Sequence, residues 1–327
     1  MKMAKLRYEV NSIHKQIKHY LRMKRAMEGK LDPISHDLAI MIKQIHAIEK
    51  GLAMETPRLG FGASRILKML TCLEHYYALG GDMSVDECTM ACSVLWSYLR
   101  FHDNAGWTGE EYSKTKERIK AFFPEDIGKG YGGTLTIHPN DLKLDKVAFE
   151  EIVNSRHSIR SFKRIPVKPD ELRKALELAM RAPSACNRQA VRVYILDHTN
   201  FGIIKRWKGG AKTFIDKVDK LLIVTGQMAA YEYDEFYQYS ISAGMFAGYL
   251  TLSLHVYGIG SCVLQRSLLG ENAWSDIAKA LNIPENEQPV CAIAIGIPND
   301  KVNVPVSQRL SYDRIVKEII DDDINHN

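Results

Sequence analysis

The spacing of apolar residues changes once along this chain of 327 residues, and the change falls at a segment rich in glycine and proline. Before residue 124 apolar residues recur every three or four positions, which is typical of amphipathic helices packed together. After residue 145 such stretches alternate with short runs rich in β-branched residues, "VRVYIL", "KLLIVTG" and "PVCAIAIG". These runs are typical of buried strands. The sequence therefore predicts a helical region followed by a domain of helices and strands.

The segment between the two patterns contains four glycines and two prolines within residues 124–140. Because glycine and proline interrupt helices and strands alike, we interpret it as a linker. We place an all-α N-terminal region at residues 1–123, the linker at 124–144 and the second domain at 145–327. The expected fold class is α+β, with a mixed β-sheet flanked by helices. A chain that begins near residue 141 is then expected to fold without the N-terminal helices.

Two local patterns belong to the helical region. The stretch "SHDLAIMIKQIHAIEKGLAM" predicts a helix that begins at a capping residue, Ser35, and ends near Gly51. Cys88 and Cys92 lie four positions apart in another helical stretch and are interpreted as small core residues. A zinc site would need a second pair of ligands, and none follows, so no metal is expected.

The formal net charge is +5, and much of it lies near the N-terminus. There Lys15 and Lys18 interleave with Ile13, Ile17 and Leu21, which predicts a basic amphipathic helix. We favour a solvated helix face over an acidic partner, nucleic acid or a membrane surface, since no nucleic-acid-binding motif accompanies it. No run of about 18 apolar residues occurs, and the first residues are charged, so we expect a cytoplasmic protein without a membrane partner.

A cationic motif, "SRHSIRSF", follows the predicted helix of residues 146–154. Alternation along an extended segment sends Arg156, Ser158 and Arg160 to one side. Guanidinium groups this close repel one another unless a negative group lies between them, and two arginines with a hydroxyl bind phosphate or carboxylate well. Ion pairs with Asp or Glu on the surface are the alternative, and the motif alone does not decide between them.

A second motif, "MRAPSACNRQAVRVYIL", follows a helix that Pro169 opens and Pro183 ends. Asn187 and Gln189 lie just before the strand and offer amide groups that could bind the edge of a planar heterocycle. Taken alone, the segment is more typical of an ordinary turn than of a binding site.

Together the two motifs, in this order and spacing, resemble the FMN-dependent nitroreductase family. The resemblance continues in "SAGMFAGYLTLSLHVYGIGSCVLQ", which is similar to that family's long central helix and glycine-marked turn. It ends in "AIAIGIPNDKVNVPVSQRLSYDRIV", similar to its last core strand and the arginine beyond it. The resemblance covers about residues 145–318 and leaves the helical N-terminal region without an assigned chemistry.

The resemblance implies that FMN is the anion and that it lies at the interface of a homodimer. Ser307 stands where many relatives carry a second basic residue, which implies a different phosphate contact. No catalytic side chain is implied, because the flavin supplies the chemistry. The residues implied to bind the cofactor are Arg156, His157, Ser158, Arg160 and Arg309 around the ribityl chain, phosphate and pyrimidine edge, Val263, Leu264 and Gln265 along the isoalloxazine ring, and Pro183, Ser184, Ala185, Asn187 and Gln189 from the partner subunit.

The implied activity is that of an oxidoreductase in which NAD(P)H reduces FMN by hydride transfer to N5 and the flavin reduces a small organic acceptor. The absence of a G-x-G-x-x-G or P-loop motif agrees with nicotinamide binding through the flavin. The alternatives are a dehydrogenase, dehalogenase or oxygen-using enzyme of the same fold, and a non-catalytic scaffold. Cys262 is expected to be a buried, inert thiol. The aromatic residues Tyr231, Tyr233, Phe236 and Tyr237 are expected in the core rather than over the substrate.

Overall fold

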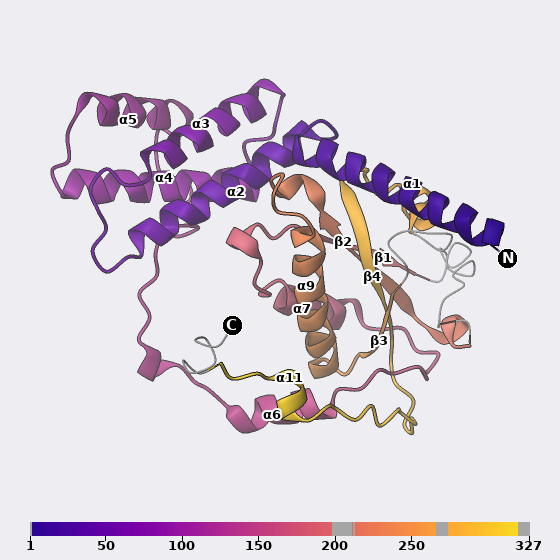
Figure 1. The fold of residues 1–327 in the computed structure, drawn as a ribbon. Coiled ribbons are helices and arrows are strands. Elements are labelled where there is room, and N and C mark those ends of the chain that lie inside the picture. The colour runs from indigo at the N-terminus through magenta and orange to yellow at the C-terminus, as the bar shows by residue number, and fades with distance from the viewer. Residues whose placement is uncertain (1, 198–210, 212, 266–273, 320–327) are drawn as a thin grey trace.

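The computed structural model describes residues 2–197, 211, 213–265 and 274–319. Helices fill its N-terminal half, and a sheet with flanking helices follows, so the expected α+β class is confirmed (Figure 1). The helices are α1 (Lys2–Met27), α2 (Pro33–Leu52), α3 (Ala63–Ala78), α4 (Asp86–Asn104), α5 (Glu110–Phe122), α6 (Lys146–Ser155), α7 (Pro169–Ala179), α9 (Gln238–Val256), α10 (Ser275–Ala280) and α11 (Tyr312–Ile315). The strands are β1 (Val191–Leu196), β2 (Lys220–Gln227), β3 (Gly260–Leu264) and β4 (Glu287–Gly296).

Short 3-10 helices connect several of these elements. They are η1 (Pro139–Asp141), η2 (Ala185–Asn187), η4 (Ile215–Lys217) and η5 (Met228–Ala230).

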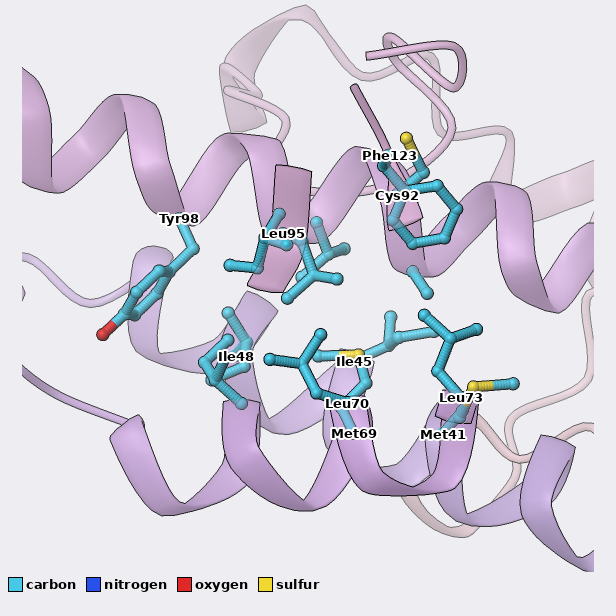
Figure 2. Packing of buried hydrophobic residues seen from close by; sticks show 14 of the residues in the cluster. Met41, Ile45, Ile48, Met69, Leu70, Leu73, Cys92, Leu95, Tyr98 and Phe123 are labelled. Atoms are coloured by element: carbon cyan, nitrogen blue, oxygen red, sulfur yellow. The ribbon is translucent and has the colours of Figure 1, made fainter. Parts of the chain in front are cut away.

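Helices α2 to α5 enclose one core, whose apolar side chains interdigitate in Figure 2. Cys88 and Cys92 are both fully buried there, as expected for small core residues. The cap of α2 differs from the prediction. Asp32, not Ser35, is the capping residue, and its carboxylate accepts a hydrogen bond from the Ser35 backbone N–H at 3.0 Å. The helix runs past Gly51 to Leu52, close to the expected end.

The sheet has the strand order β1-β2-β4-β3, and each of its three ladders is antiparallel. Parallel pairing is confined, among the described residues, to an isolated bridge between Ser158 and Ser261, so the sheet is less mixed than expected. The strand β1 is a half-exposed edge strand rather than a buried one. The strand β3 lies where the sequence indicated only a glycine-marked turn.

Apolar side chains of the two central strands alternate between the two faces of the sheet. Leu222 and Val224 of β2 pack on the face covered by α7 and α9, whereas Leu221 and Ile223 pack on the opposite face with Trp274. Figure 1 shows α9 and α7 against the sheet. Met180 follows the last residue of α7 and is 61% exposed.

The helix α1 leaves the other N-terminal helices and runs across the top of the sheet in Figure 1. Its last turns pack into the second half of the chain, where Met23 and Met27 share a core with Met228, Tyr231 and Tyr239. Farther from this core, Ile13 and Ile17 are more than half exposed. Thus one end of the basic helix is solvated as expected, and the other end belongs to a core that the sequence did not indicate.

The predicted linker packs in its first half against α4. The hydroxyl of Ser93 accepts a hydrogen bond from the Gly132 backbone N–H at 3.1 Å. A Cβ at Gly128 would lie 2.5 Å from the Thr89 carbonyl oxygen, so only glycine permits this approach. Residues 134–138 and 142–144 are exposed and form no helix or strand. The domain limits at 123 and 145 stay a prediction, and the free part of the linker is shorter than its composition indicated.

Candidate functional site

The cationic motif lies beside β3 in an extended conformation. Ser158 forms a parallel bridge with Ser261, and the Ile159 backbone N–H donates to the Ser261 carbonyl oxygen at 2.8 Å. The side chain of Ile159 packs on the core and would contact a Cβ at Gly260 at 3.1 Å, which favours glycine there. In this parallel register residues 156–160 run beside residues 259–263, so that Arg160 reaches the level of Val263, although about a hundred positions separate the two segments in the sequence.

Arg156 and His157 lie at the point where α6 ends, close to His255 of α9. The imidazole of His255 shares a hydrogen bond with the Ser155 hydroxyl at 2.8 Å. Burial lowers the pKa of His255, and the charges of Arg156 and His157 lower it further. His255 is therefore neutral near pH 7, and the positive charge in this corner comes from the arginines.

Arg160 is exposed and donates through Nη1 to the Ser158 carbonyl oxygen at 3.4 Å. It lies close enough to Cys262 to act on its thiol, whose pKa burial raises and Arg160 lowers in part. Cys262 is buried, as expected, and the inertness of its thiol stays a prediction.

Arg309 lies in the segment that follows β4 and donates to the Ser307 carbonyl oxygen at 2.6 Å. Ser307 itself has a φ of 48°, an uncommon conformation for a residue with a side chain. Within the described residues, the ion pairs do not include Arg156, Arg160 or Arg309. The surface ion pairs that were the alternative explanation for this motif are therefore not formed there.

Val263 and Leu264 of β3 and Gln265, which follows the strand, differ in what they offer a ligand. Val263 is 39% exposed and Gln265 is exposed, so both side chains are accessible. Leu264 is buried in the core, which leaves only its backbone for a ligand. His157 is half-buried, and its Nδ1 shares a hydrogen bond with the Ser155 carbonyl oxygen at 2.8 Å.

The loop of the second motif has an unusual backbone. Cys186, Asn187 and Gln189 have φ values of 51°, 53° and 51°, in the left-handed region that favours glycine. The Ser184 hydroxyl accepts from the Gln189 backbone N–H at 3.0 Å, and the Ser184 carbonyl oxygen accepts from the Asn187 N–H at the same distance. Pro183, Asn187 and Gln189 are exposed, while Ser184 and Ala185 are half-buried.

One residue that holds this loop escaped the sequence reasoning. The side chain of Arg188 is fully buried, donates to Glu235 Oε1 at 2.8 Å and lies 4.8 Å from the ring centre of Tyr231. The sequence signal for Arg188 is a cationic residue between the polar residues Asn187 and Gln189 of the turn. Without the fold, however, it could not be told from the exposed arginines nearby.

A cavity of about 790 Å³ separates this loop from the N-terminal helices. Its wall includes Pro183, Ser184 and Gln189 on one side and residues of α2 and α4, such as Leu38 and Glu87, on the other. None of the residues of the cationic motif or of β3 lines it. Within one chain, the loop of residues 183–189 thus lies apart from residues 156–160 and β3, and Arg309 follows in the segment after β4.

The aromatic residues before α9 pack against α1. Tyr231 is fully buried, the ring of Phe236 stacks on Tyr20 at 6.0 Å, and the hydroxyls of Tyr233 and Tyr20 are 2.5 Å apart. Tyr237 is exposed and has a φ of 64°. Tyr231 and Phe236 lie in or against the core as expected, but Tyr233 and Tyr237 are 51% and 62% exposed, so for these two the expectation was wrong. The segment serves the contact with α1.

The comparison with known protein families finds a match in the second half of the chain. Residues 153–202 and 200–297 match the model of the Nitroreductase family. The match spans a little less than half of the chain, and this part of the chain is similar to that family. The matched residues include the whole cationic motif, the loop of residues 183–189 and β3, whereas Arg309 and the N-terminal helices lie outside the match.

Solved structures of the same family are similar to this part of the chain. An FMN-dependent nitroreductase from Clostridium difficile is 22% identical, with 52% of this chain and 99% of that chain covered and a TM-score of 0.45. A nitroreductase family protein from Streptococcus pneumoniae is 21% identical, with 52% and 100% covered and a TM-score of 0.44. One from Clostridium novyi is 23% identical, with 46% and 86% covered and a TM-score of 0.41. Because these TM-scores are low, the similarity to the family rests on the match to the family model.

Two further searches concern other kinds of site. Among the described residues, none of the helices combines the length and the apolar character needed to span a membrane. In the same part of the chain, no three His, Cys, Asp or Glu side chains gather in a way that could hold a metal ion.

Proposed function

We propose that this chain is an FMN-dependent oxidoreductase that uses NAD(P)H to reduce a small organic molecule. The bound flavin would supply the redox chemistry, taking up hydride at N5 and passing electrons to the acceptor. The side chains of the protein bind and orient the cofactor and define the space above it. Arg156, Arg160 and Arg309 are proposed to hold the phosphate and the pyrimidine edge, with Val263 and Gln265 along the ring.

The observation that carries the proposal is the pairing of Ser158 with Ser261. It brings together two motifs that the family resemblance assigns to one cofactor. The arginines beside this pairing form no ion pair among the described residues, so their charge is available to an anion. Charge-assisted hydrogen bonds of this kind contribute about 1.5–3 kcal/mol each. The donor set therefore fits a phosphate-bearing cofactor.

The loop of residues 183–189 is proposed to serve the flavin site of a second copy in a homodimer. Two apolar surfaces support this arrangement. On α9, Ile241, Met245 and Tyr249 form a stripe at four-residue spacing and are each more than 40% exposed. In the segment after β4, Val306 and Leu310 are 85% and 67% exposed. Apolar surface of this extent is typical of a protein interface.

A titration of FMN against the purified protein, followed by flavin fluorescence, tests the cofactor site. Arg156→Ala and Arg309→Ala should each weaken FMN binding by on the order of tenfold or more, because each removes a charged donor to the phosphate. Riboflavin, which lacks the phosphate, should be affected much less. Arg173→Ala is the matched control, since Arg173 is exposed on α7 and pairs with Glu177 at 2.8 Å. Equal losses for FMN and riboflavin would overturn the phosphate assignment.

Mixed dimers test the shared site. If Arg156→Ala and Asn187→Ala each abolish flavin binding alone, refolding the two together should restore one intact site in each mixed dimer. Random pairing then returns roughly a quarter of the wild-type occupancy. Isolated mixed dimers that bind no flavin would show that both residues serve one site from one chain.

Bleaching of the bound flavin by NADH or NADPH tests the enzymatic part of the proposal. Loss of the oxidised flavin absorbance under anaerobic conditions is the expected result. A protein that binds FMN and is bleached by neither nucleotide would be a scaffold and not a reductase. We also propose a cytoplasmic location, and fractionation of the source cells tests it.

A further inference from the structure

A series of charged contacts connects the N-terminal helices to the loop of residues 183–189. Lys43 of α2 and Lys68 of α3 pair with Glu232 at 2.6 and 3.1 Å. Lys43 also lies 3.9 Å from Glu235, which in turn accepts from Arg188 of the loop at 2.8 Å. The Glu235 carboxylate is further oriented by the Glu232 backbone N–H at 2.9 Å. The contacts therefore run without interruption from outside the part of the chain that matches the family into the loop.

The backbone of the loop has an unfavourable conformation, so a contact with the rest of the protein must hold it in place. A positive φ is unfavourable for residues other than glycine, and Cys186, Asn187 and Gln189 all have one. Asn187 and Gln189 point outward, so their side chains do not hold the loop to the core. Arg188 lies between them and is 3% exposed. The conformation of the loop is therefore fixed mainly by what holds Arg188.

Glu235 is the carboxylate that holds Arg188. The Nε and Nη1 atoms of Arg188 are buried and form no hydrogen bond among the described residues, so the polar contact runs through Nη2 alone. A buried charge that loses its partner is strongly destabilised. The position of the Glu235 carboxylate therefore decides where the guanidinium, and with it the loop backbone, comes to rest.

The lysines of the N-terminal helices keep the acidic partners charged and in place. A hydrogen bond from Lys43 lowers the pKa of Glu232 to about 2, with Lys68 acting in the same direction against the effect of burial. The hydrogen bond from Arg188 lowers the pKa of Glu235, again against burial. The side chain of Lys43 is only 17% exposed, so its contacts are less screened than those of a surface ion pair.

We propose that the N-terminal helices position the cofactor-binding loop of residues 183–189 through Lys43, Glu235 and Arg188. Lys43 is thus a positioning residue that acts from outside the part of the chain that matches the family. This inference rests on the proposed flavin site, but its central contacts can be tested in the protein without flavin.

The first experiment compares Lys43→Met with Lys116→Met. Lys116 is the matched control, because it pairs with Asp103 at 2.7 Å within the helical region and takes no part in the series. Lys43→Met should weaken FMN binding by about tenfold while the melting temperature changes little, and Lys116→Met should leave both unchanged. Lys43→Arg should retain most of the affinity, since the charge remains. An FMN affinity unchanged in Lys43→Met would overturn the proposal.

A double-mutant cycle tests whether Lys43 acts through Arg188. Arg188→Lys keeps the charge but loses the planar contact with Tyr231 and should weaken FMN binding as well. If the two residues act in one series, the losses in Lys43→Met/Arg188→Lys should be clearly less than the product of the single losses. Independent, multiplying losses would contradict the proposed connection.

Hydrogen exchange in the flavin-free protein separates this inference from the proposed function. In Lys43→Met the backbone amides of residues 184–190 should exchange faster, and those of β2 should not change. If the wild type binds no FMN and the loop still loosens in Lys43→Met, the proposed cofactor is wrong and the positioning role holds. If the loop exchanges at the wild-type rate, the positioning role is wrong whether or not FMN binds.

Discussion

Replacing Met27 by Ala should destabilise the sheet domain, although Met27 belongs to the first helix of the chain. Met27 is 5% exposed and lies in a cluster with Met23 from α1 and with Met228, Tyr231 and Tyr239 from the second half of the chain. The cluster is the apolar contact by which α1 holds the residues before and at the start of α9. A cavity there removes contacts from both parts at once.

The magnitude follows from the cost of truncating a buried methionine. Such substitutions lower the free energy of unfolding by about 2–5 kcal/mol, depending on how far the neighbours fill the space. Met23 and Met228 are flexible side chains that can partly fill a cavity. We therefore expect a loss of about 2–3 kcal/mol. Met54→Ala is the control, because Met54 is 63% exposed and its truncation should change stability by less than about 0.5 kcal/mol.

Hydrogen exchange by mass spectrometry is the assay, since it reports on each region separately. In Met27→Ala the amides of α1 and also those of β2 should lose protection, because β2 leads directly into Met228 of the shared core. If only α1 loses protection while β2 exchanges at the wild-type rate, α1 would be a peripheral helix and the reasoning would fail. The same outcome would remove the physical basis for expecting the N-terminal helices to influence the loop of residues 183–189.

Two further predictions concern the packing of α1 and α9. Burial, together with the charge of Arg22, lowers the pKa of His19 to about 4, and its Nε2 lies 3.0 Å from the Tyr239 hydroxyl oxygen. The histidine of the unfolded chain keeps its ordinary pKa of about 6.5 and therefore binds a proton more readily. The contribution of His19 to stability should be complete above about pH 6.5 and should be lost as the pH falls towards 4. Urea unfolding at several pH values measures this, and His19→Gln should lose the part of the pH dependence that comes from this residue. Gly226→Ala places a Cβ 2.5 Å from the carbonyl oxygen of Tyr239 in α9 and should lower the melting temperature. Gly244 also lies in α9, but a Cβ there meets no atom within 4 Å, so Gly244→Ala should raise the melting temperature slightly.

The fold class and most elements could be predicted from the sequence, because long amphipathic helices and β-branched runs carry strong periodic signals. The predicted strands at 191–196, 220–226 and 289–296 and the helix at 146–154 agree with the structure within a few residues. The strand β3 was missed because its five residues, Gly260–Leu264, neither alternate nor contain a long β-branched run. Its stability comes from pairing with β4 and with Ser158, which no local pattern shows.

The candidate site was predictable in its parts but not in its arrangement. The cationic motif was found from its charge pattern and residues 263–265 were named from the family resemblance, but only the fold shows that the motif lies beside β3. Arg188 was not predicted, because its burial depends on Glu235 and on Lys43 from a helix about 145 positions away in the sequence. Charged residues take their roles from three-dimensional contacts, so sequence patterns place them poorly unless a motif is already known.

The same reasoning changes what is expected of a chain that begins near residue 141. The glycine-rich segment indicated a clean division, but without α1 and α2 the sheet domain would expose Met228, Tyr231 and Tyr239, all fully buried in the intact chain. It would also lose Lys43 and Lys68, leaving Glu232 without its partners. We therefore expect this shortened chain to aggregate on expression or to bind FMN more weakly than the full chain. A shortened chain that is monodisperse and binds FMN with full affinity would show that the core shared with α1 contributes little, and the composition of the linker would then have been the better guide.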